Sequence, residues 1–331
     1  MEHFKEHWFP YLLGIIILIV IANGLLSDER GKENLFIKAD KQISIVPNIY
    51  ELSNSDADNL IRYGKQLIDS TAKYFGPHGS VSPITNGLNC QNCHRESGTK
   101  LYTNNFLAVA STYPKFRERS GVMESIEFRV NDCMQRSLNG NSIDSLSKEM
   151  RAMVAYIKWT GKNVKKNIQA EGAGNKELLF LERAADPSAG ILIYAKKCSS
   201  CHGKNGEGIV SFDSVGFVYP PLWGTHSYAV SAGMFRLSKL ASFIKNNMPF
   251  GATYNDPLLS SEEAWDLAAY INSQPHPKKM FVEDWPVLRT KPIDYPLGPY
   301  ADNFSEKQHK YGPFNPIKKV RDELIAMAAK K

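Results

Sequence analysis

The chain of 331 residues has no long run of lysine or arginine, although its formal net charge is +6. Its 40 basic residues are interleaved with 34 acidic ones, which argues against the dense basic patch of a nucleic-acid-binding protein. Charged residues make up 22% of the chain and hydrophobic residues 43%, so we expect a packed core and no extensive disorder. A moderate positive charge suits small anionic substrates or an acidic protein partner equally well.

Long apolar stretches are also scarce, and the one near the N-terminus is informative. Residues 8–27 carry no charge, and residues 12–22 are almost purely aliphatic. At about 1.5 Å per residue this length crosses a bilayer core, so residues 1–27 predict a transmembrane signal anchor. The alternative is a secretory signal peptide cleaved near Ala22-Asn23-Gly24, but its basic n-region is poor and the apolar run is long for one.

Cysteine is rare too, with five in the whole chain, and four of these form two Cys-x-x-Cys-His motifs at residues 90–94 and 198–202. In this motif the two thiols add to the vinyl groups of a haem and the histidine binds the iron. A Cys-x-x-Cys pair alone would also suit zinc or a disulfide, but the histidine that follows both times favours haem. The motifs therefore predict two covalently bound haems c, attached through Cys90, Cys93, Cys198 and Cys201, with His94 and His202 as proximal ligands.

The fifth cysteine, Cys133, has no partner for a disulfide once the other four are assigned to haem. Because bacteria attach haem c outside the cytoplasm, we expect the chain to lie on the periplasmic side of the inner membrane, held by the anchor. An unpaired thiol in that oxidising compartment is a liability unless it has a function.

Helical periodicity predicts an all-α protein with two tandem cytochrome c domains. We expect helices at residues 56–75, 148–159, 189–197, 237–246 and 260–273. The two closing helices form an internal repeat, because the residues of the first recur 114 positions later in the second. The recurring residues are Ser147, Glu149, Ala155, Tyr156 and Ile157, then Ser261, Glu263, Ala269, Tyr270 and Ile271.

The predicted organisation has six parts. After the anchor at 1–27 comes a polar connector at 28–50, the first cytochrome c domain at 51–162 and a hydrophilic linker at 163–175. The second cytochrome c domain covers 176–275, and residues 276–331 form an extended C-terminal tail that wraps over the surface and ends in a short helix at 320–329. In this tail we expect His276 and His309 to be surface residues rather than iron ligands.

Each iron needs a second axial ligand or an open position. In the second domain Met248 is followed by proline just before the closing helix, which suits a thioether ligand, with Met234 as the alternative. The first domain has no histidine between His94 and His202, and the sequence offers Cys133 and the adjacent Met134. Spacing from the closing helix does not choose between them, whereas the unpaired thiol favours Cys133.

Basic residues cluster near Cys133 in the sequence. Arg129, Cys133 and Ser137 follow one another at intervals of four, so on a helix they share one face. Arg119 and Arg136 lie close by in the chain. Because guanidinium groups bind oxyanions through two parallel hydrogen bonds, these residues predict an anion pocket beside the first haem.

At this point the sequence resembles the dihaem thiosulfate dehydrogenase / tetrathionate reductase family of periplasmic cytochromes c. The resemblance runs from about residue 56 to 317 and is carried by "LNCQNCH", "YPKFRERSG", "IEFRVNDCMQRSLNG", "MRAMVAYIKW", "NNMPFG" and the tail beginning "DWPVLRTKPIDYPLGPY". It implies that Cys133 is the distal ligand of haem 1 and Met248 that of haem 2. It also implies that Arg119, Arg129 and Ser137 line the thiosulfate pocket. In this family the residue before the methionine ligand can be a lysine that competes with it for the iron of haem 2. This chain has Asn247 at that position, so we do not expect the iron to exchange one ligand for another.

The function expected from this resemblance is oxidation of two thiosulfates to tetrathionate, the reverse reduction, or both. Electrons would pass through haem 2 to an external cytochrome c or a quinone-linked partner. Cys133 would act either as a tuning ligand or as a nucleophile that takes up a sulfane sulfur. The alternatives are a membrane-anchored dihaem electron carrier with Met134 as ligand, and a Sox-type sulfur cytochrome, against which the long tail argues.

Overall fold

The computed structural model describes residues 46–328. The predicted anchor at 1–27 and most of the connector at 28–50 lie outside this range. Among the described residues, no helix is both long enough and apolar enough to cross a membrane.

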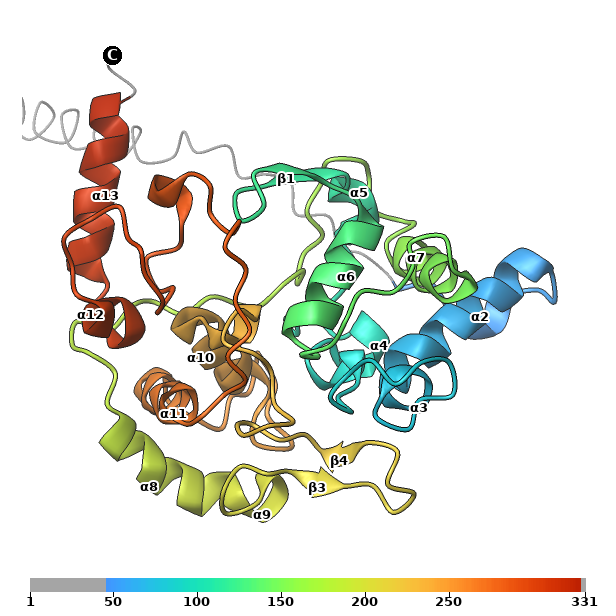
Figure 1. Cartoon of the computed structure of the whole chain (residues 1–331), viewed down its shortest axis with the longest axis horizontal. Coiled ribbons are helices and arrows are strands. Elements are labelled where there is room, and N and C mark those ends of the chain that lie inside the picture. Colours follow the sequence, from blue (N-terminus) through green and yellow to red (C-terminus); the bar gives the residue numbers. More distant parts are fainter. Residues whose placement is uncertain (1–45, 329–331) are drawn as a thin grey trace, which may run out of the picture. The chain divides into compact units, whose positions relative to one another are not determined.

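The first half of the described chain is built on two crossing helices, α2 (Asp56–Asp69) and α7 (Lys148–Thr160), which lie side by side in Figure 1. Ser55 and Ser147 cap their N-termini by accepting hydrogen bonds from Asp58 and Met150. Both helices contribute to one hydrophobic core, in which Leu67 and Met150 are fully buried. η1 (Ile49–Glu51) precedes α2. Between α2 and α7 the chain forms α3 (Thr71–Phe75), η2 (Cys90–Asn92), α4 (Arg95–Gly98), α5 (Val109–Thr112), β1 (Lys115–Arg117), β2 (Val122–Glu124) and α6 (Ile126–Arg136).

The single helix predicted at residues 56–75 is interrupted at Ser70, between α2 and α3. The interruption serves the first haem motif. The Thr71 hydroxyl accepts a hydrogen bond from the Cys90 backbone N–H at 3.0 Å, and the Gln91 side chain donates to the Asp69 carbonyl at 2.6 Å. The broken helix therefore holds the motif in place.

The second half repeats the arrangement with α8 (Pro187–Lys197) crossing α11 (Ser261–Ser273). Ser260 and Glu263 form a reciprocal capping box at the start of α11. The helices predicted at 148–159, 189–197, 237–246 and 260–273 are all confirmed, with small shifts at their ends. The remaining elements of this half are α9 (Ser199–His202), β3 (Ile209–Val210), β4 (Phe217–Tyr219), η3 (Gly233–Phe235) and α10 (Leu237–Asn247).

Two short antiparallel hairpins correct the all-α prediction. Strands β1 and β2 pair Phe116 with Met123, and β3 and β4 pair Ile209 with Tyr219. Both cores are nevertheless made by helices, since these strands are short and largely exposed. The hairpins shape loops around the two halves rather than forming a core sheet.

Polar contacts join the two halves. The Asn86 side chain donates to the Ser227 carbonyl at 3.0 Å, and the Ala229 N–H donates to the Arg136 carbonyl at the end of α6, also at 3.0 Å. The segment before η3 is therefore hydrogen-bonded to the first half next to the predicted substrate pocket.

The C-terminal segment contains η4 (Leu288–Thr290), α12 (Glu306–Tyr311) and α13 (Asn315–Ala328), so its last helix starts five residues before the predicted one. Phe314 and Ile317 belong to the core of the second half. The prediction of His309 as a surface residue is wrong. Its ring is fully buried, stacked on Tyr300, with Nδ1 against the Ile293 carbonyl and Nε2 against Asp302.

Candidate active site

The proximal histidines are oriented by backbone carbonyl groups. Nδ1 of His94 hydrogen-bonds to the Asn104 carbonyl, and Nδ1 of His202 to the Pro220 carbonyl at 2.8 Å. Burial lowers the pKa of both imidazoles, that of His94 to about 4, so both rings are neutral at pH 7. A neutral ring that donates from Nδ1 leaves the Nε2 lone pair free for a metal.

The other groups of the two motifs also fit covalent haem. Cys90, Cys93, Cys198 and Cys201 are all free thiols, and the first three pack against the hydrophobic cores. Each pair is followed by a histidine whose orientation is fixed through Nδ1 and whose Nε2 has no hydrogen-bond partner among residues 46–328. These donor sets match the attachment and proximal ligation of two haems c.

Cys133 lies on α6 close to the first motif. Burial raises the pKa of the Cys90 and Cys93 thiols, and a negative charge on Cys133 would raise both further, so the three sulfurs lie in one neighbourhood. Met134, the alternative ligand, is fully buried in the core of the first half. This favours Cys133 over Met134, although its bond to iron stays a prediction.

Guanidinium groups surround the Cys133 thiol. Burial raises the pKa of Cys133, and the positive charges of Arg129, Arg119 and Arg117 oppose this rise, Arg129 most strongly. In turn Cys133 is the main cause that raises the pKa of Arg129. The structure therefore brings together Arg119, Arg129 and Cys133, as predicted, and adds Arg117 of β1.

Ser137 lies one turn beyond Cys133, at the C-terminal end of α6. Its backbone N–H donates to the Cys133 carbonyl at 2.9 Å, which closes the last turn of the helix. Its predicted role in the substrate pocket stays a prediction.

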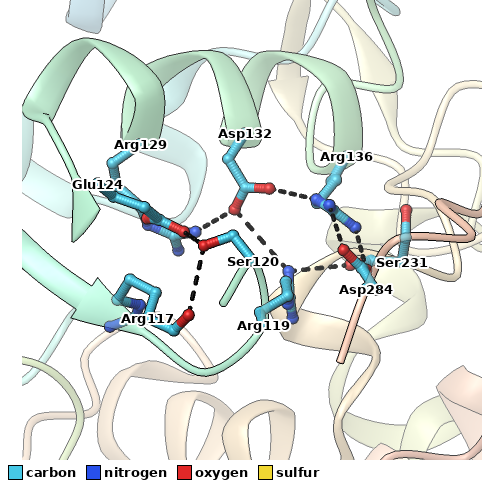
Figure 2. A network of polar contacts seen from close by, with 9 residues as sticks. All are labelled: Arg117, Arg119, Ser120, Glu124, Arg129, Asp132, Arg136, Ser231 and Asp284. Carbon is cyan, nitrogen blue, oxygen red and sulfur yellow. Dashed lines mark hydrogen bonds and ion pairs between the residues drawn. The ribbon is translucent and has the colours of Figure 1, made fainter. Parts of the chain in front are cut away.

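Asp132 is the centre of an ion network that Figure 2 shows from close by. Its carboxylate accepts hydrogen bonds from Arg129 and from Nε of Arg136, and Arg119 lies 3.8 Å away. Burial alone would raise the pKa of Asp132, but the three guanidinium groups hold it below its usual value. Asp132 is therefore ionised at neutral pH. The Asp132 network, as we call it below, consists of Arg119, Arg129, Asp132, Arg136 and Asp284.

The fifth member of the network comes from the C-terminal segment. Asp284 accepts two hydrogen bonds from Arg136, at 2.6 and 2.7 Å, across 148 residues of sequence. The next residue, Trp285, donates its backbone N–H to the Arg119 carbonyl at 2.7 Å, and its ring lies 5.4 Å from the Arg119 guanidinium. The tail thus contacts two of the three arginines.

A cavity of about 800 Å³ borders this network. Arg119, Asp132 and Asp284 contribute to its wall, but Cys133 and Arg129 do not. It is therefore not the space that the thiol faces, and we do not identify it with the substrate pocket.

Met248 follows α10 directly, and its N–H donates to the Ile244 carbonyl at 2.9 Å. It is partly buried against the core of the second half. The preceding Asn247 is buried and donates to the carbonyls of Tyr102 at 3.3 Å and Phe243 at 3.1 Å. Residue 247 therefore connects the methionine segment to the first half of the chain.

Sequence reasoning missed the carboxylates that hold these arginines. Arg129, Asp132 and Arg136 are spaced by three and four residues, which is a recognisable helical ion-pair pattern. Asp284 and Trp285 carry no such signal, because their partners lie far away in the sequence.

Two protein-family models match the chain: "SoxA/TsdA, cytochrome c domain" at residues 82–165 and "Cytochrome c" at residues 188–275. Together with the two motifs they show two helix-rich cytochrome c domains and two covalently bound haems c. The domain limits given above stay predictions.

Curated relatives match most of the chain. The thiosulfate dehydrogenase of Psychrobacter arcticus is 34% identical over 244 residues, which is 73% of this chain and 71% of that protein. Those of Allochromatium vinosum and Stutzerimonas stutzeri are 37% and 31% identical, covering 60% and 74% of this chain and 73% and 76% of theirs. Among solved structures, thiosulfate dehydrogenase (TsdBA) from Marichromatium purpuratum, in the "as isolated" form, matches with a TM-score of 0.66 at 26% identity. That match covers 76% of this chain and 52% of the solved one.

Proposed function

Because the chain belongs to the thiosulfate dehydrogenase family of dihaem cytochromes c, we propose that it oxidises two thiosulfate ions to one tetrathionate ion. One S–S bond forms between the two sulfane sulfurs, and two electrons leave. When bound, the two haems supply two one-electron acceptors, which matches the number released. The observation that supports this most directly is the set of guanidinium groups around the Cys133 thiol, beside the first haem motif.

The arginines have a clear electrostatic task in this reaction. Two thiosulfate dianions at 4 Å repel each other by about 4 kcal/mol even in bulk water, and by more in a partly buried site. Arg129 and Arg119 neutralise this repulsion and, through their planar donor groups, orient the two oxyanion ends. Ser137 would add a hydroxyl donor one helical turn beyond Cys133.

Cys133 has two roles that fit its surroundings. As the distal ligand of haem 1 opposite His94, its thiolate would lower the reduction potential. As a nucleophile, it would join its sulfur to the sulfane sulfur of one thiosulfate as two electrons leave. A second thiosulfate would then displace the thiolate and release tetrathionate. Arg129 favours the thiolate form in both roles.

Electrons would leave through haem 2, for which we propose His202 and Met248 as axial ligands. The acceptor would be an external cytochrome c or a quinone-linked protein, and the same residues would serve the reverse reduction of tetrathionate. We place the protein on the periplasmic side of the inner membrane, held there by residues 1–27.

The substitution Cys133→Met tests this function. It keeps a sulfur at the position but removes the thiolate, so we expect thiosulfate oxidation with an artificial acceptor to fall at least a hundredfold. Mass spectrometry of the intact protein would verify that both haems remain attached. We also expect the low-spin thiolate signal of haem 1 in the electron paramagnetic resonance (EPR) spectrum to disappear. Full activity in this variant would refute the assignment and favour a simple electron carrier.

A further inference from the structure

We propose that the Asp132 network positions Arg129 and Arg119 for thiosulfate, so that the C-terminal segment forms a supporting part of the substrate site. This inference rests on the proposed function, because thiosulfate is the ligand it concerns. Asp132 and Asp284 would not contact the substrate. They would act through the arginines, as positioning residues.

Asp132 is placed to fix the direction of two substrate-binding guanidinium groups at once. One carboxylate oxygen, Oδ2, accepts from Arg129 and lies 3.8 Å from Arg119, while Oδ1 accepts from Arg136. The Asp132 side chain is only 7% exposed, so little water competes for these contacts. Arg129 uses Nη1 for Asp132, which leaves its other donors for an anion near Cys133.

The tail completes the arrangement from the other side. Arg136 is held between Asp132 and Asp284, and its guanidinium lies 3.9 Å from the Phe281 ring centre. The Arg136 and Asp284 side chains are 8% and 9% exposed. Since Arg136 is fixed by Asp284, it fixes Oδ1 of Asp132 in turn. The contacts form a continuous chain from the tail to the arginine beside Cys133.

The charges of the network also suit an anion site. Three guanidinium groups face two carboxylates, which leaves one net positive charge, while near Cys133 the charge of Arg117 is offset by the buried carboxylate of Glu124. The carboxylates offset part of the mutual repulsion of the arginines, so the guanidinium groups can lie close together. Removing one carboxylate would let the guanidinium groups separate, and misplacement by about 1 Å can cost a hundredfold in a reacting site.

Thiosulfate binding can be measured apart from turnover. We suggest equilibrium dialysis of ³⁵S-labelled thiosulfate against the holoprotein with both haems kept ferrous, because the irons then accept no electrons. The variants are Asp132→Asn, Asp284→Asn and the double variant. Asp322→Asn is the matched control, because Asp322 belongs to an exposed ion pair with Lys318 in the same C-terminal segment.

We expect Asp284→Asn to weaken thiosulfate binding about tenfold and Asp132→Asn by about as much or more. The double variant should bind no more weakly than Asp132→Asn alone, because Asp284 acts through Asp132. Asp322→Asn should bind like the wild type. Haem content, and the EPR signals of haem 2 in a separately oxidised sample, should be unchanged in all four variants.

The possible failures are distinguishable. If the wild type binds thiosulfate and both single variants bind it with the affinity of the wild type, the network is only structural and this inference is wrong. If the wild type itself does not bind thiosulfate, the proposed function fails and the inference fails with it. Should Asp132→Asn not fold, Asp284→Asn alone decides, and recovery of binding in Asp284→Glu supports the proposal.

Discussion

Gly64 of α2 lies directly against the backbone carbonyl of Ala152 in α7. A Cβ atom added at residue 64 would lie 2.0 Å from that oxygen. The second half repeats the contact, since a Cβ atom at Gly190 of α8 would lie 2.1 Å from the Asp266 carbonyl oxygen of α11. Each cytochrome c domain thus depends on one glycine where its two long helices cross.

We therefore predict that Gly64→Ala and Gly190→Ala each lower the free energy of unfolding by about 2–3 kcal/mol. The added methyl group meets backbone rather than a flexible side chain, so the helices must move apart. Urea denaturation followed by circular dichroism measures the loss. Gly233→Ala is the control, because nothing lies within 4 Å of a Cβ atom there. Equal stability of all three variants would contradict the tight crossing.

The fold was predictable where the repeat is regular. Tyr156 and Tyr270 are 114 residues apart. The same offset relates Ala152 to Asp266, whose backbone carbonyl groups contact the glycines at the two helix crossings. The glycines are 126 residues apart, because the segments between the opening and closing helices differ in length. The same offset therefore does not reveal them.

The candidate site was predictable only where its parts are close in the sequence. Arg129 and Cys133 are four residues apart on one helix, and that spacing alone placed them together. Asp284 reaches Arg136 across 148 residues, and the extended tail has no periodicity from which such a contact follows. His309 was wrongly placed at the surface for the same reason.

Asp294 of the C-terminal segment caps the N-terminus of α10, whose own N-cap residue provides no capping hydrogen bond. Arg236, at the N-cap of α10, makes no side-chain capping bond, whereas Asp294 accepts from the Ser238 N–H at 3.1 Å and from Arg236 at 2.7 Å. Asp294 is 1% exposed. We predict that Asp294→Asn lowers the free energy of unfolding by about 3 kcal/mol at pH 6, measured by urea denaturation. Asp322→Asn, in an exposed pair, should cost less than about 0.5 kcal/mol.

The same carboxylate predicts a pH dependence. Burial alone would raise the pKa of Asp294, but Arg236 and Ser238 outweigh it and hold the pKa below its usual value. A lowered folded pKa means that the stabilisation is complete above the unfolded value of about 3.9 and disappears as the pH falls through the folded value. The difference in unfolding free energy between the wild type and Asp294→Asn should therefore shrink between pH 4 and pH 2. A difference that stays constant over this range would contradict the assignment.

The proposed ligation of haem 2 by Met248 makes a prediction about its potential. If Met248 is the second axial ligand, its thioether raises the reduction potential of haem 2 relative to that given by a second histidine. We expect Met248→His to lower the midpoint potential of haem 2 on the order of 100 mV, with both haems still attached. Spectroscopic redox titration measures the change. The control is Met327→His, because Met327 is 63% exposed on α13. An unchanged midpoint potential of haem 2 in Met248→His would contradict this ligation and favour Met234 as the ligand.

Substitutions of Arg129 separate the effect of its charge from that of its geometry on the proposed binding of thiosulfate. Arg129→Lys keeps the positive charge but loses the planar fork that binds an oxyanion through two hydrogen bonds. We expect it to raise the KM for thiosulfate about tenfold, and Arg129→Gln to raise it further. Because part of the attraction is electrostatic, the KM of the wild type should rise with ionic strength more steeply than that of Arg129→Gln. Steady-state kinetics at two salt concentrations test both points, with Arg151→Gln, at an exposed position of α7, as the control. If Arg129→Gln kept the KM of the wild type, thiosulfate would have to bind away from Cys133.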